Sequence, residues 1–426
     1  MKKIIFPAFL VFLSYLAAAQ DSITVMHYNL LYYGINTSFC TSQNNNVNIK
    51  DQYLSTIIDY VQPDIFTVNE LGRGEANADR ILNGVLNAGD ESRFSRAAYS
   101  NTTNSTIVNM LYYDHNKFSL YFEAVAANIL RDINLYTLYY NDQEGLEAGD
   151  TIFLTAIVAH FKAGSTASDQ QTRTAEAQAV MAYINSNNIR GNLLFMGDFN
   201  MNASFEQAFQ HITYHPNEAI RFYDPVDQPG QWYNNPAMAR YHTQSTRTGS
   251  HACFVTGGLD DRYDLILTSH AILEGYMGLH FIEESYQALG QDGNRYNQSV
   301  IDPPNNSAPQ MVVEALYGMS DHLPVVMKMQ TSQITVSTPE YFAANGRFIF
   351  NNPVADRLNL KISGVSLPVV VSLYSLTGEK LFTSPAKHFL PGETWSVDLS
   401  RLSPGIYILR AEGSMVKPFS TKVIKH

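Results

Sequence analysis

The chain has 426 residues and a formal net charge of −11, and its hydrophobic content of 45% is typical of a globular protein with two or three domains. The charge is uneven, because residues 346–426 contain ten Lys/Arg against five Asp/Glu, whereas residues 4–345 contain 16 basic and 34 acidic residues. Such an acidic body lacks the broad cationic surface of proteins that bind duplex nucleic acid tightly and non-specifically.

The first 19 residues have the composition of a signal peptide. Lys2 and Lys3 precede an apolar run at residues 4–16, and Ala17-Ala18-Ala19 supplies the small residues of a cleavage site, with Gln20 as the mature start. The run is shorter than the ~20 residues that a membrane-spanning helix needs. We therefore predict a secreted or cell-surface protein that passes through the periplasm and has no stable membrane insertion. Its two cysteines, Cys40 and Cys253, are compatible with one disulfide, but sequence alone does not show that they meet.

Residues 20–330 alternate between β-rich runs and a few helical patterns. Strands are expected at residues 23–28, 64–68, 106–113, 151–159, 193–196, 265–268 and 323–327, and helices at 49–61 and 172–189. Residues 36–48 are rich in Asn, Ser and Thr, and residues 224–258 contain many Gly, Pro, Asn and His residues. Both stretches predict surface loops that shape a binding site.

The C-terminal residues have a different pattern. Residues 331–345 read as a polar linker, and short β-rich runs follow at 358–362, 369–373, 395–399 and 406–410. Turn signals such as Thr377-Gly378 separate these runs. We predict a small all-β sandwich over residues 346–426.

Polar residues interrupt the apolar runs at strand boundaries of the body. Asn29, Glu70, His160 and Asp198 follow predicted strands, while Asp264, Asp321 and His322 precede them. In a mixed sheet, strand ends and strand starts meet at one edge, so these seven side chains are expected to line one cleft. Taken singly, each has an ordinary explanation as a turn former or a packed residue. Their joint order is what favours a functional site.

This order resembles the endonuclease/exonuclease/phosphatase superfamily, which includes pancreatic-type deoxyribonucleases, abasic-site endonucleases, sphingomyelinases and inositol-polyphosphate phosphatases. The matching segments, spread over residues 23–329, are His27-Tyr28-Asn29, Val68-Asn69-Glu70, His160-Phe161-Lys162, Gly197-Asp198-Phe199-Asn200, Tyr263-Asp264-Leu265-Ile266 and Ser320-Asp321-His322. Tyr28 replaces the more common Trp or Phe, and Asn69 the usual Gln. The resemblance implies an α/β fold, a four-layer α/β/β/α sandwich with two mixed sheets.

The resemblance also implies roles for these residues. Glu70, with Asn29 and Asp321, would hold Mg²⁺, or alternatively Mn²⁺ or Ca²⁺, since these ions prefer oxygen ligands. His322, oriented by Asp264 or Asp321, would act as base or contact the phosphate, and Asp198 would position or deprotonate the attacking water. Asn200 and His160 would contact the phosphate, and His160 would also protonate the leaving oxygen. The sequence does not decide which histidine is acid and which is base.

Supporting residues have two explanations each. Lys162, Arg173 and Arg73 are either phosphate contacts or ordinary solvated side chains. Trp232, Tyr233 and His242 either stack on substrate or pack the long loop against its scaffold.

The C-terminal segment resembles a type IX secretion sorting domain of Bacteroidetes-type bacteria. The resemblance covers residues 348–426 and is carried by Asn352-Pro353, the run Val371 to Tyr374, the string Leu402 to Tyr407 and the terminal run Lys422 to His426. It implies that the type IX secretion machinery is a partner. A carbohydrate-binding or adhesive sandwich is the alternative.

The sequence thus predicts a secreted, divalent-metal-dependent phosphodiester hydrolase, with an endonuclease acting on extracellular nucleic acid as the leading hypothesis. A phosphatase or phospholipase-like phosphodiesterase acting on lipid or inositol phosphates is the alternative. A non-catalytic binding or adhesion protein is disfavoured, because all the motif residues are present together.

Overall fold

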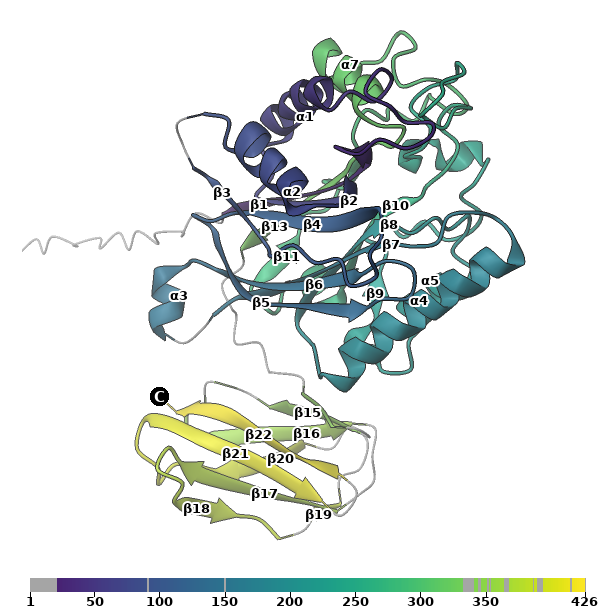
Figure 1. The fold of residues 1–426 in the computed structure, drawn as a ribbon. Helices are drawn as coiled ribbons and strands as arrows, with labels where there is room; N and C mark the ends of the chain where they lie inside the picture. Colours follow the sequence, from purple (N-terminus) through teal and green to yellow (C-terminus); the bar gives the residue numbers. More distant parts are fainter. Residues whose placement is uncertain are drawn as a thin grey trace, which may run out of the picture.

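The computed structural model describes residues 21–89, 92–148 and 151–331 of the body, and 341–343, 346–350, 352, 354–363, 368–385, 387–388, 394–413 and 416–425 of the C-terminal part (Figure 1). The predicted signal peptide lies outside the described residues, as does most of the predicted linker, in which β14 (Tyr341–Ala343) is assigned. No helix within the described ranges is long and apolar enough to cross a membrane.

Two mixed sheets form the centre of the body. The first has the order β11-β13-β1-β2-β4-β3, with β12 beside β13, and the second has the order β5-β6-β7-β8-β10-β9. The first comprises β1 (Ser22–Tyr33), β2 (Ile65–Gly72), β3 (Phe94–Arg96), β4 (Ile107–Asp114), β11 (Leu279–Phe281), β12 (Gln287–Ala288) and β13 (Val325–Thr331). The second comprises β5 (Phe118–Ala127), β6 (Ile133–Tyr140), β7 (Phe153–His160), β8 (Asn192–Asp198), β9 (Phe222–Tyr223) and β10 (Asp264–Ser269). In each sheet one pair is parallel, β1 with β2 and β7 with β8, and the other pairs are antiparallel.

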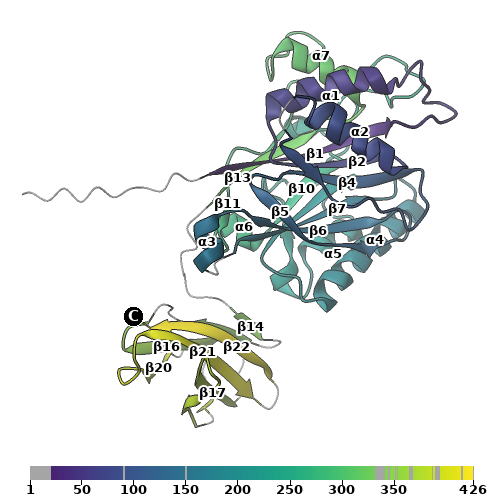
Figure 2. The same cartoon turned by 60° about the vertical axis from the view of Figure 1, so that its left-hand side comes forward.

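Helices cover the outer faces of both sheets. The helices α1 (Val47–Val61), α2 (Glu75–Ile81) and α7 (Gln310–Met319) lie over the first sheet, and α4 (Ala167–Ser186) and α5 (Gln207–Thr213) lie over the second (Figures 1 and 2). The short helices α3 (Gln143–Ala148) and α6 (His270–Glu274) lie at the periphery. The predicted four-layer sandwich is confirmed.

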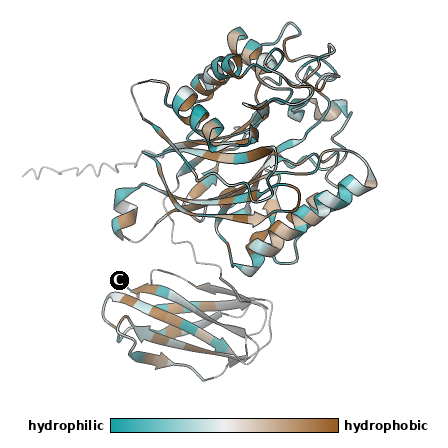
Figure 3. Ribbon diagram, in the orientation of Figure 1, coloured by the Kyte–Doolittle hydropathy of each residue, from teal (hydrophilic) through white to brown (hydrophobic). Residues whose placement is uncertain are grey.

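The hydrophobic core explains this layering. One buried cluster joins residues of both sheets, such as Phe66 and Met196, with Leu54 of α1 and Leu316 of α7. A second cluster packs Val180 of α4 against the outer face of the second sheet. In Figure 3 the strands are largely hydrophobic, whereas the helices alternate between the two colours, as expected for helices that bury one face.

Helix α4 differs from its predicted position. It begins at Ala167 rather than residue 172, because Thr166 and Asp169 form a reciprocal capping box that satisfies the free N–H groups of the first turn. It ends at Ser186, before the predicted end at residue 189. The start of α1 is fixed in the same way by Asn46, whose side chain accepts from the backbone N–H groups of Asn48 and Ile49.

The C-terminal part forms two antiparallel sheets, which confirms the predicted all-β sandwich. One has the order β14-β15-β16-β20, and the other has the order β18-β17-β21-β22, with β19 beside β17. Beyond β14 these strands are β15 (Gly346–Phe350), β16 (Arg357–Ser363), β17 (Pro368–Ser375), β18 (Lys380–Thr383), β19 (Lys387–His388), β20 (Thr394–Asp398), β21 (Gly405–Gly413) and β22 (Val416–Lys425). A separate cluster of buried residues, including Leu360, Leu373 and Leu409, forms its core.

Candidate active site

Strand register brings the predicted site residues together. His160 ends β7 and pairs with Asp198 at the end of the parallel strand β8. Asp264 begins the antiparallel strand β10 and also pairs with Asp198. Three chemically active side chains therefore stand beside one another at one edge of the second sheet, as expected where strand ends and strand starts meet.

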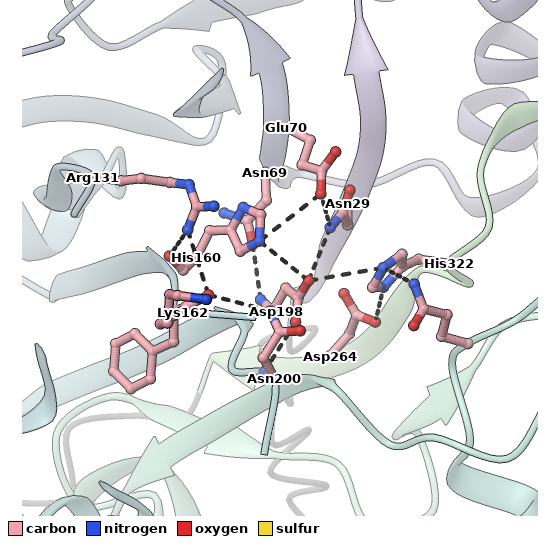
Figure 4. Close-up of polar contacts among 12 residues, drawn as sticks. Asn29, Asn69, Glu70, Arg131, His160, Lys162, Asp198, Asn200, Asp264 and His322 are labelled. Carbon is pink, nitrogen blue, oxygen red and sulfur yellow. Dashed lines mark hydrogen bonds and ion pairs between the residues drawn. The ribbon is translucent and has the colours of Figure 1, made fainter. Parts of the chain in front are cut away.

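Asn29 and Glu70 reach the same place from the first sheet. The amide nitrogen of Asn29 donates to Asp198 Oδ2 at 3.0 Å and to Glu70 Oε1 at 3.2 Å (Figure 4). Glu70 adopts a left-handed backbone with φ 55°, a conformation that is unfavourable for a residue with a Cβ atom. Its other carboxylate oxygen accepts from the backbone N–H of Tyr32 at 3.1 Å. These contacts hold the Glu70 carboxylate against Asp198.

His322 forms an Asp–His pair with Asp264. Its Nδ1 lies 2.7 Å from Asp264 Oδ2, and its Nε2 lies 3.8 Å from Asp198 Oδ2. Thr243 also donates its hydroxyl to Asp264 Oδ2, at 2.6 Å. The sequence left Asp264 and Asp321 open as partners of His322, and the structure selects Asp264. Asp321 instead accepts from the backbone N–H of Val255 at 2.9 Å.

Gln244 of the long loop closes the site over His322. Its amide nitrogen lies 2.6 Å from Nε2 of the ring. When the ring is neutral the amide donates to Nε2, and when the ring carries both protons a half-turn of the amide presents its oxygen instead. Gln244 therefore supports His322 in either protonation state.

His160 lies on the other side of Asp198. Its Nε2 is 3.5 Å from Asp198 Oδ2 and 3.9 Å from Glu70 Oε1, so the ring faces both carboxylates. Arg131 donates to the backbone carbonyl of His160 at 3.0 Å and fixes the end of β7. Asn200 follows Asp198 by two residues, and its backbone N–H donates to Asp198 Oδ1 at 3.0 Å.

Burial and mutual repulsion shift the pKa values of these groups. Burial raises the pKa of Glu70, and the neighbouring Asp321 carboxylate raises it further. Burial also raises the pKa of Asp198, although His322 opposes this shift. Burial lowers the pKa of His160, and the charges of Arg131 and His322 add to this shift. Burial by itself would also lower the pKa of His322. The carboxylates of Asp264, Asp198 and Asp321 outweigh burial and raise this pKa well above its usual value.

The donor set fits a divalent cation. Glu70, His160 and Asp198 each offer a ligand atom, and these atoms lie within 4.8 Å of one another. Glu70, Asp198, Asp264 and Asp321 have no Lys or Arg ion-pair partner within the described ranges of the chain, so four carboxylates face only two imidazoles. A hard cation prefers such oxygen ligands and would offset their repulsion. Of the predicted ligands, Glu70 belongs to this group, Asn29 contacts it, and Asp321 stays a prediction.

Metal binding predicts a thermal shift that needs no substrate. We expect Mg²⁺ or Mn²⁺, at roughly 100 times its Kd, to stabilise the native protein by about 2.7 kcal/mol, or about 5 °C in melting temperature. Glu70→Gln should remove most of this shift, because it replaces a charged ligand with a neutral one. Differential scanning fluorimetry against EDTA measures the effect, with the exposed Glu314→Gln as the matched control. Equal shifts in both variants would contradict a metal site at Glu70.

Several supporting residues differ from their predicted roles. Arg173 is fully buried and binds Glu206 through Nε and Nη2 at 3.0 and 2.8 Å, so it is neither solvated nor free to contact phosphate. Lys162 lies beyond the end of β7 and pairs with Asp169 at 2.7 Å. Trp232 is fully buried against Phe209, and His242 binds the carbonyl of Trp232 at 2.9 Å. These two aromatic residues pack the loop, whereas Tyr233 stays exposed.

Other residues of the site were not singled out from the sequence. Thr243 and Gln244 lie within the irregular stretch 224–258, where no periodicity or motif marks them. Arg131 precedes β6 and carries no motif either. Only their contacts with Asp264, His322 and His160 in the structure identify these three residues as part of the site.

A disulfide joins the two loops beside the site. Cys40 and Cys253 are bonded, with a Cα–Cα distance of 4.5 Å, and they connect residues 36–48 to the long loop. This pairing agrees with the oxidising environment that an exported protein meets.

Residues 348–426 match the family model of the secretion system C-terminal sorting domain. This match confirms the second resemblance and covers the all-β sandwich from within β15 onward. A C-terminal sorting domain indicates export to the cell surface or secretion, and interaction with the secretion machinery. The carbohydrate-binding alternative has no comparable support.

The chain aligns with several solved structures. An endonuclease/exonuclease/phosphatase from Bacteroides vulgatus aligns with 13% identity and a TM-score of 0.44, over 73% of this chain and 100% of that one. A family protein from Bacteroides thetaiotaomicron aligns with 14% identity and a TM-score of 0.45, over 74% and 96%. The human nocturnin catalytic domain aligns with 15% identity and a TM-score of 0.43, over 74% and 97%. No curated protein matches the sequence. These values are too low to transfer an activity, so the chemistry must come from the side chains themselves.

Proposed function

We propose that the protein is a secreted, divalent-metal-dependent phosphodiester hydrolase. The observation that carries this proposal is the arrangement around Asp198, which has His160 on one side and the Asp264–His322 pair on the other. An Asp–His pair beside a carboxylate suits proton transfer to or from a reacting oxygen. The sorting domain supports its placement outside the cell.

Each side chain of the site has a task in this proposal. A bound divalent ion would neutralise phosphate charge, and the carboxylates of Glu70 and Asp198 would hold it. Asn29, whose amide nitrogen donates to both carboxylates, would position these ligands. Asp198 orients the attacking water and accepts its proton, because its Oδ2 stands between the two histidines. Asp264 accepts from Nδ1–H of His322, which leaves Nε2, beside Asp198 and Gln244, as the ring atom that exchanges a proton with a reacting oxygen. His160 directs Nε2 toward Asp198 and Glu70, where the phosphate would lie. The side-chain amide of Asn200 donates one hydrogen to the carbonyl of Phe161 and has the other for the phosphate.

We further propose that the substrate is extracellular nucleic acid and that cleavage is internal. The motif segments are common to nucleases, phosphatases and lipid phosphodiesterases of the superfamily that the chain resembles, so a comparison of substrates decides among these three classes. The acidic body implies weak rather than tight binding to duplex surfaces, with the phosphate contacts confined to the site.

Plasmid nicking tests the proposal. The chain starting at Gln20 should nick supercoiled DNA with Mg²⁺ or Mn²⁺, lose this activity in EDTA, and lose it again in Asp198→Asn. The exposed Asp59→Asn serves as the matched control and should nick normally. If folded protein left the plasmid intact while hydrolysing phosphorylated lipids or inositols, the nuclease assignment would be wrong and the phosphatase or lipid phosphodiesterase would replace it. Inactivity on all of these substrates would contradict the hydrolase itself.

A further inference from the structure

A second pocket lies at the start of α1, apart from the residues described above. Its cavity has a volume of about 240 Å³ and is lined by Asn44, Ile49, Lys50, Arg247, His251 and Tyr317, among others. None of the proposed catalytic or metal-binding residues lines it. It is nevertheless tied to the site, because Lys50 donates to the carbonyls of Leu30 and Leu31, which directly follow Asn29.

Arg247 is the main feature of this pocket. Only 8% of the residue is exposed, and its guanidinium lies over the rings of Phe254 and Tyr317, with centroid distances of 3.9 and 4.1 Å. Stacking occupies the faces of the group and leaves its N–H groups to donate within their plane. Nη2 donates to the carbonyl of Tyr317, but Nε is buried without a partner in the described structure. A buried donor without a partner is costly. The Nε atoms of Arg262 and Arg295 are also without a partner, but those two side chains bind the carboxylates of Asp224 and Asp292, whereas Arg247 binds no carboxylate in the described structure.

The pocket is lined by basic side chains in an acidic protein, although burial lowers the pKa of Lys50 to about 7. Its lining residues include Lys50, Arg247 and His251 and no Asp or Glu. Neither Lys50 nor Arg247 forms an ion pair with any residue that the structure describes, and the ammonium group of Lys50 is satisfied by two carbonyls and the side-chain oxygen of Asn45. Buried charges are normally paired. Burial lowers the pKa of Arg247, and the Asp321 carboxylate opposes this larger effect through space. Asp321 forms no ion pair with the guanidinium in the described structure, so the guanidinium has room for an anion in direct contact.

Two further features favour an anion here. His251 accepts at Nδ1 from the backbone N–H groups of Cys253 and Phe254, so the proton of its neutral ring lies on Nε2 and is available to donate. The first turn of α1 contains no acidic residue, and its dipole favours negative charge nearby. The Asn46 cap already occupies N–H groups of that turn, so the helix contributes its field and Arg247 supplies the hydrogen bonds.

We propose that this pocket binds a phosphate group through Arg247, and that in the substrate it receives a phosphate remote from the scissile bond. The second half of this proposal rests on the proposed function, whereas the first does not. A guanidinium held edge-on matches phosphate geometry. The substrate class is therefore a polyphosphodiester, with one phosphate at Asp198 and another at Arg247.

Phosphate binding is tested first, without metal. We would titrate inorganic phosphate into the chain starting at Gln20 in EDTA and measure heat by calorimetry. Ile49→Glu places a carboxylate at the rim of the pocket, at a position that is 47% exposed and falls in the first turn of α1, where Glu is favourable. It should weaken phosphate binding without disturbing the fold, and Ile49→Gln is the neutral control that should bind as the wild type does.

Arg247→Met should lower the affinity for phosphate by about tenfold or more, with the exposed Arg240→Met as its control. Thermal unfolding shows whether each variant is folded. If Arg247→Met does not fold, the comparison of Ile49→Glu with Ile49→Gln decides alone. If the wild type did not bind phosphate, or if Ile49→Glu bound it equally well, the pocket would not be a phosphate site. Arg247 would then be a packing residue only.

The second part of the proposal, that the pocket receives a remote phosphate of the substrate, is tested by measuring cleavage in Mg²⁺. The Ile49→Glu variant should raise KM for an oligonucleotide about tenfold while leaving kcat/KM for bis(4-nitrophenyl) phosphate, which has a single phosphate, unchanged, and Ile49→Gln should behave as the wild type on both substrates. If phosphate binds in EDTA but the oligonucleotide KM does not move, the pocket takes free phosphate and its assignment to substrate is wrong. If neither diester is cleaved by the wild type, the proposed function fails while the phosphate pocket stands.

Discussion

His322→Ala is expected to lower the turnover of a phosphodiester by about 10²- to 10⁴-fold, the range that a positioned acid–base group contributes. The reason is the pair that His322 forms with Asp264 at 2.7 Å, which fixes the tautomer and points Nε2 toward Asp198. Asp264→Asn should lose a similar factor, because an amide holds the ring less firmly and favours the wrong tautomer. Initial rates on bis(4-nitrophenyl) phosphate with saturating Mg²⁺ measure both effects.

The double variant distinguishes a pair from two independent groups. Since Asp264 acts through His322, the double variant His322→Ala/Asp264→Asn should be no slower than His322→Ala alone. Asp59→Asn controls for the loss of a carboxylate elsewhere on the surface. Multiplicative losses would show that Asp264 has a separate task, and wild-type rates in His322→Ala would remove the ring from the mechanism.

Arg173→Met is expected to destabilise the body by about 3–5 kcal/mol, because it leaves the buried Glu206 carboxylate without its cation. Arg173 also donates to the carbonyls of Lys162 and Gly164 at 2.9 and 2.7 Å, so it joins α4 to the segment after His160. Glu206 in turn accepts from the backbone N–H of Asn202, near Asn200. Urea unfolding followed by the fluorescence of Trp232, in a Trp395→Phe background, reports on the body alone.

A compensating variant shows whether the loss comes from the unpaired charge. Arg173→Met/Glu206→Leu should recover most of the stability, because a buried ion pair replaced by apolar side chains is often nearly neutral. Arg240→Met is the matched exposed control and should change the free energy of unfolding by less than about 0.5 kcal/mol. If Arg173→Met unfolded as the wild type does but raised KM, Arg173 would be a substrate contact after all.

The sequence determined the local features of this protein. Apolar runs predict β1, β2, β4, β7, β8, β10 and β13, because buried strands need contiguous or alternating hydrophobic residues. Polar residues at the ends of those runs identify Asn29, Glu70, His160 and Asp198. The β5–β6 hairpin was missed. Most residues of β5 are only partly buried and its hydrophobic residues do not alternate, whereas β6 is mostly buried and its apolar residues were overlooked.

Only the tertiary structure decided which of these residues meet. His322 pairs with Asp264 rather than with its neighbour Asp321, and 58 positions of chain separate the two. Cys40 bonds to Cys253 across 213 positions, and Arg173 is buried against Glu206 instead of facing a substrate. Local sequence fixes backbone preference and burial period, but partner choice depends on strand register and on loops that close over the sheet edge. Strand register and loop position are set by packing between residues that lie far apart in the chain. A local sequence pattern therefore does not reveal which residues will meet.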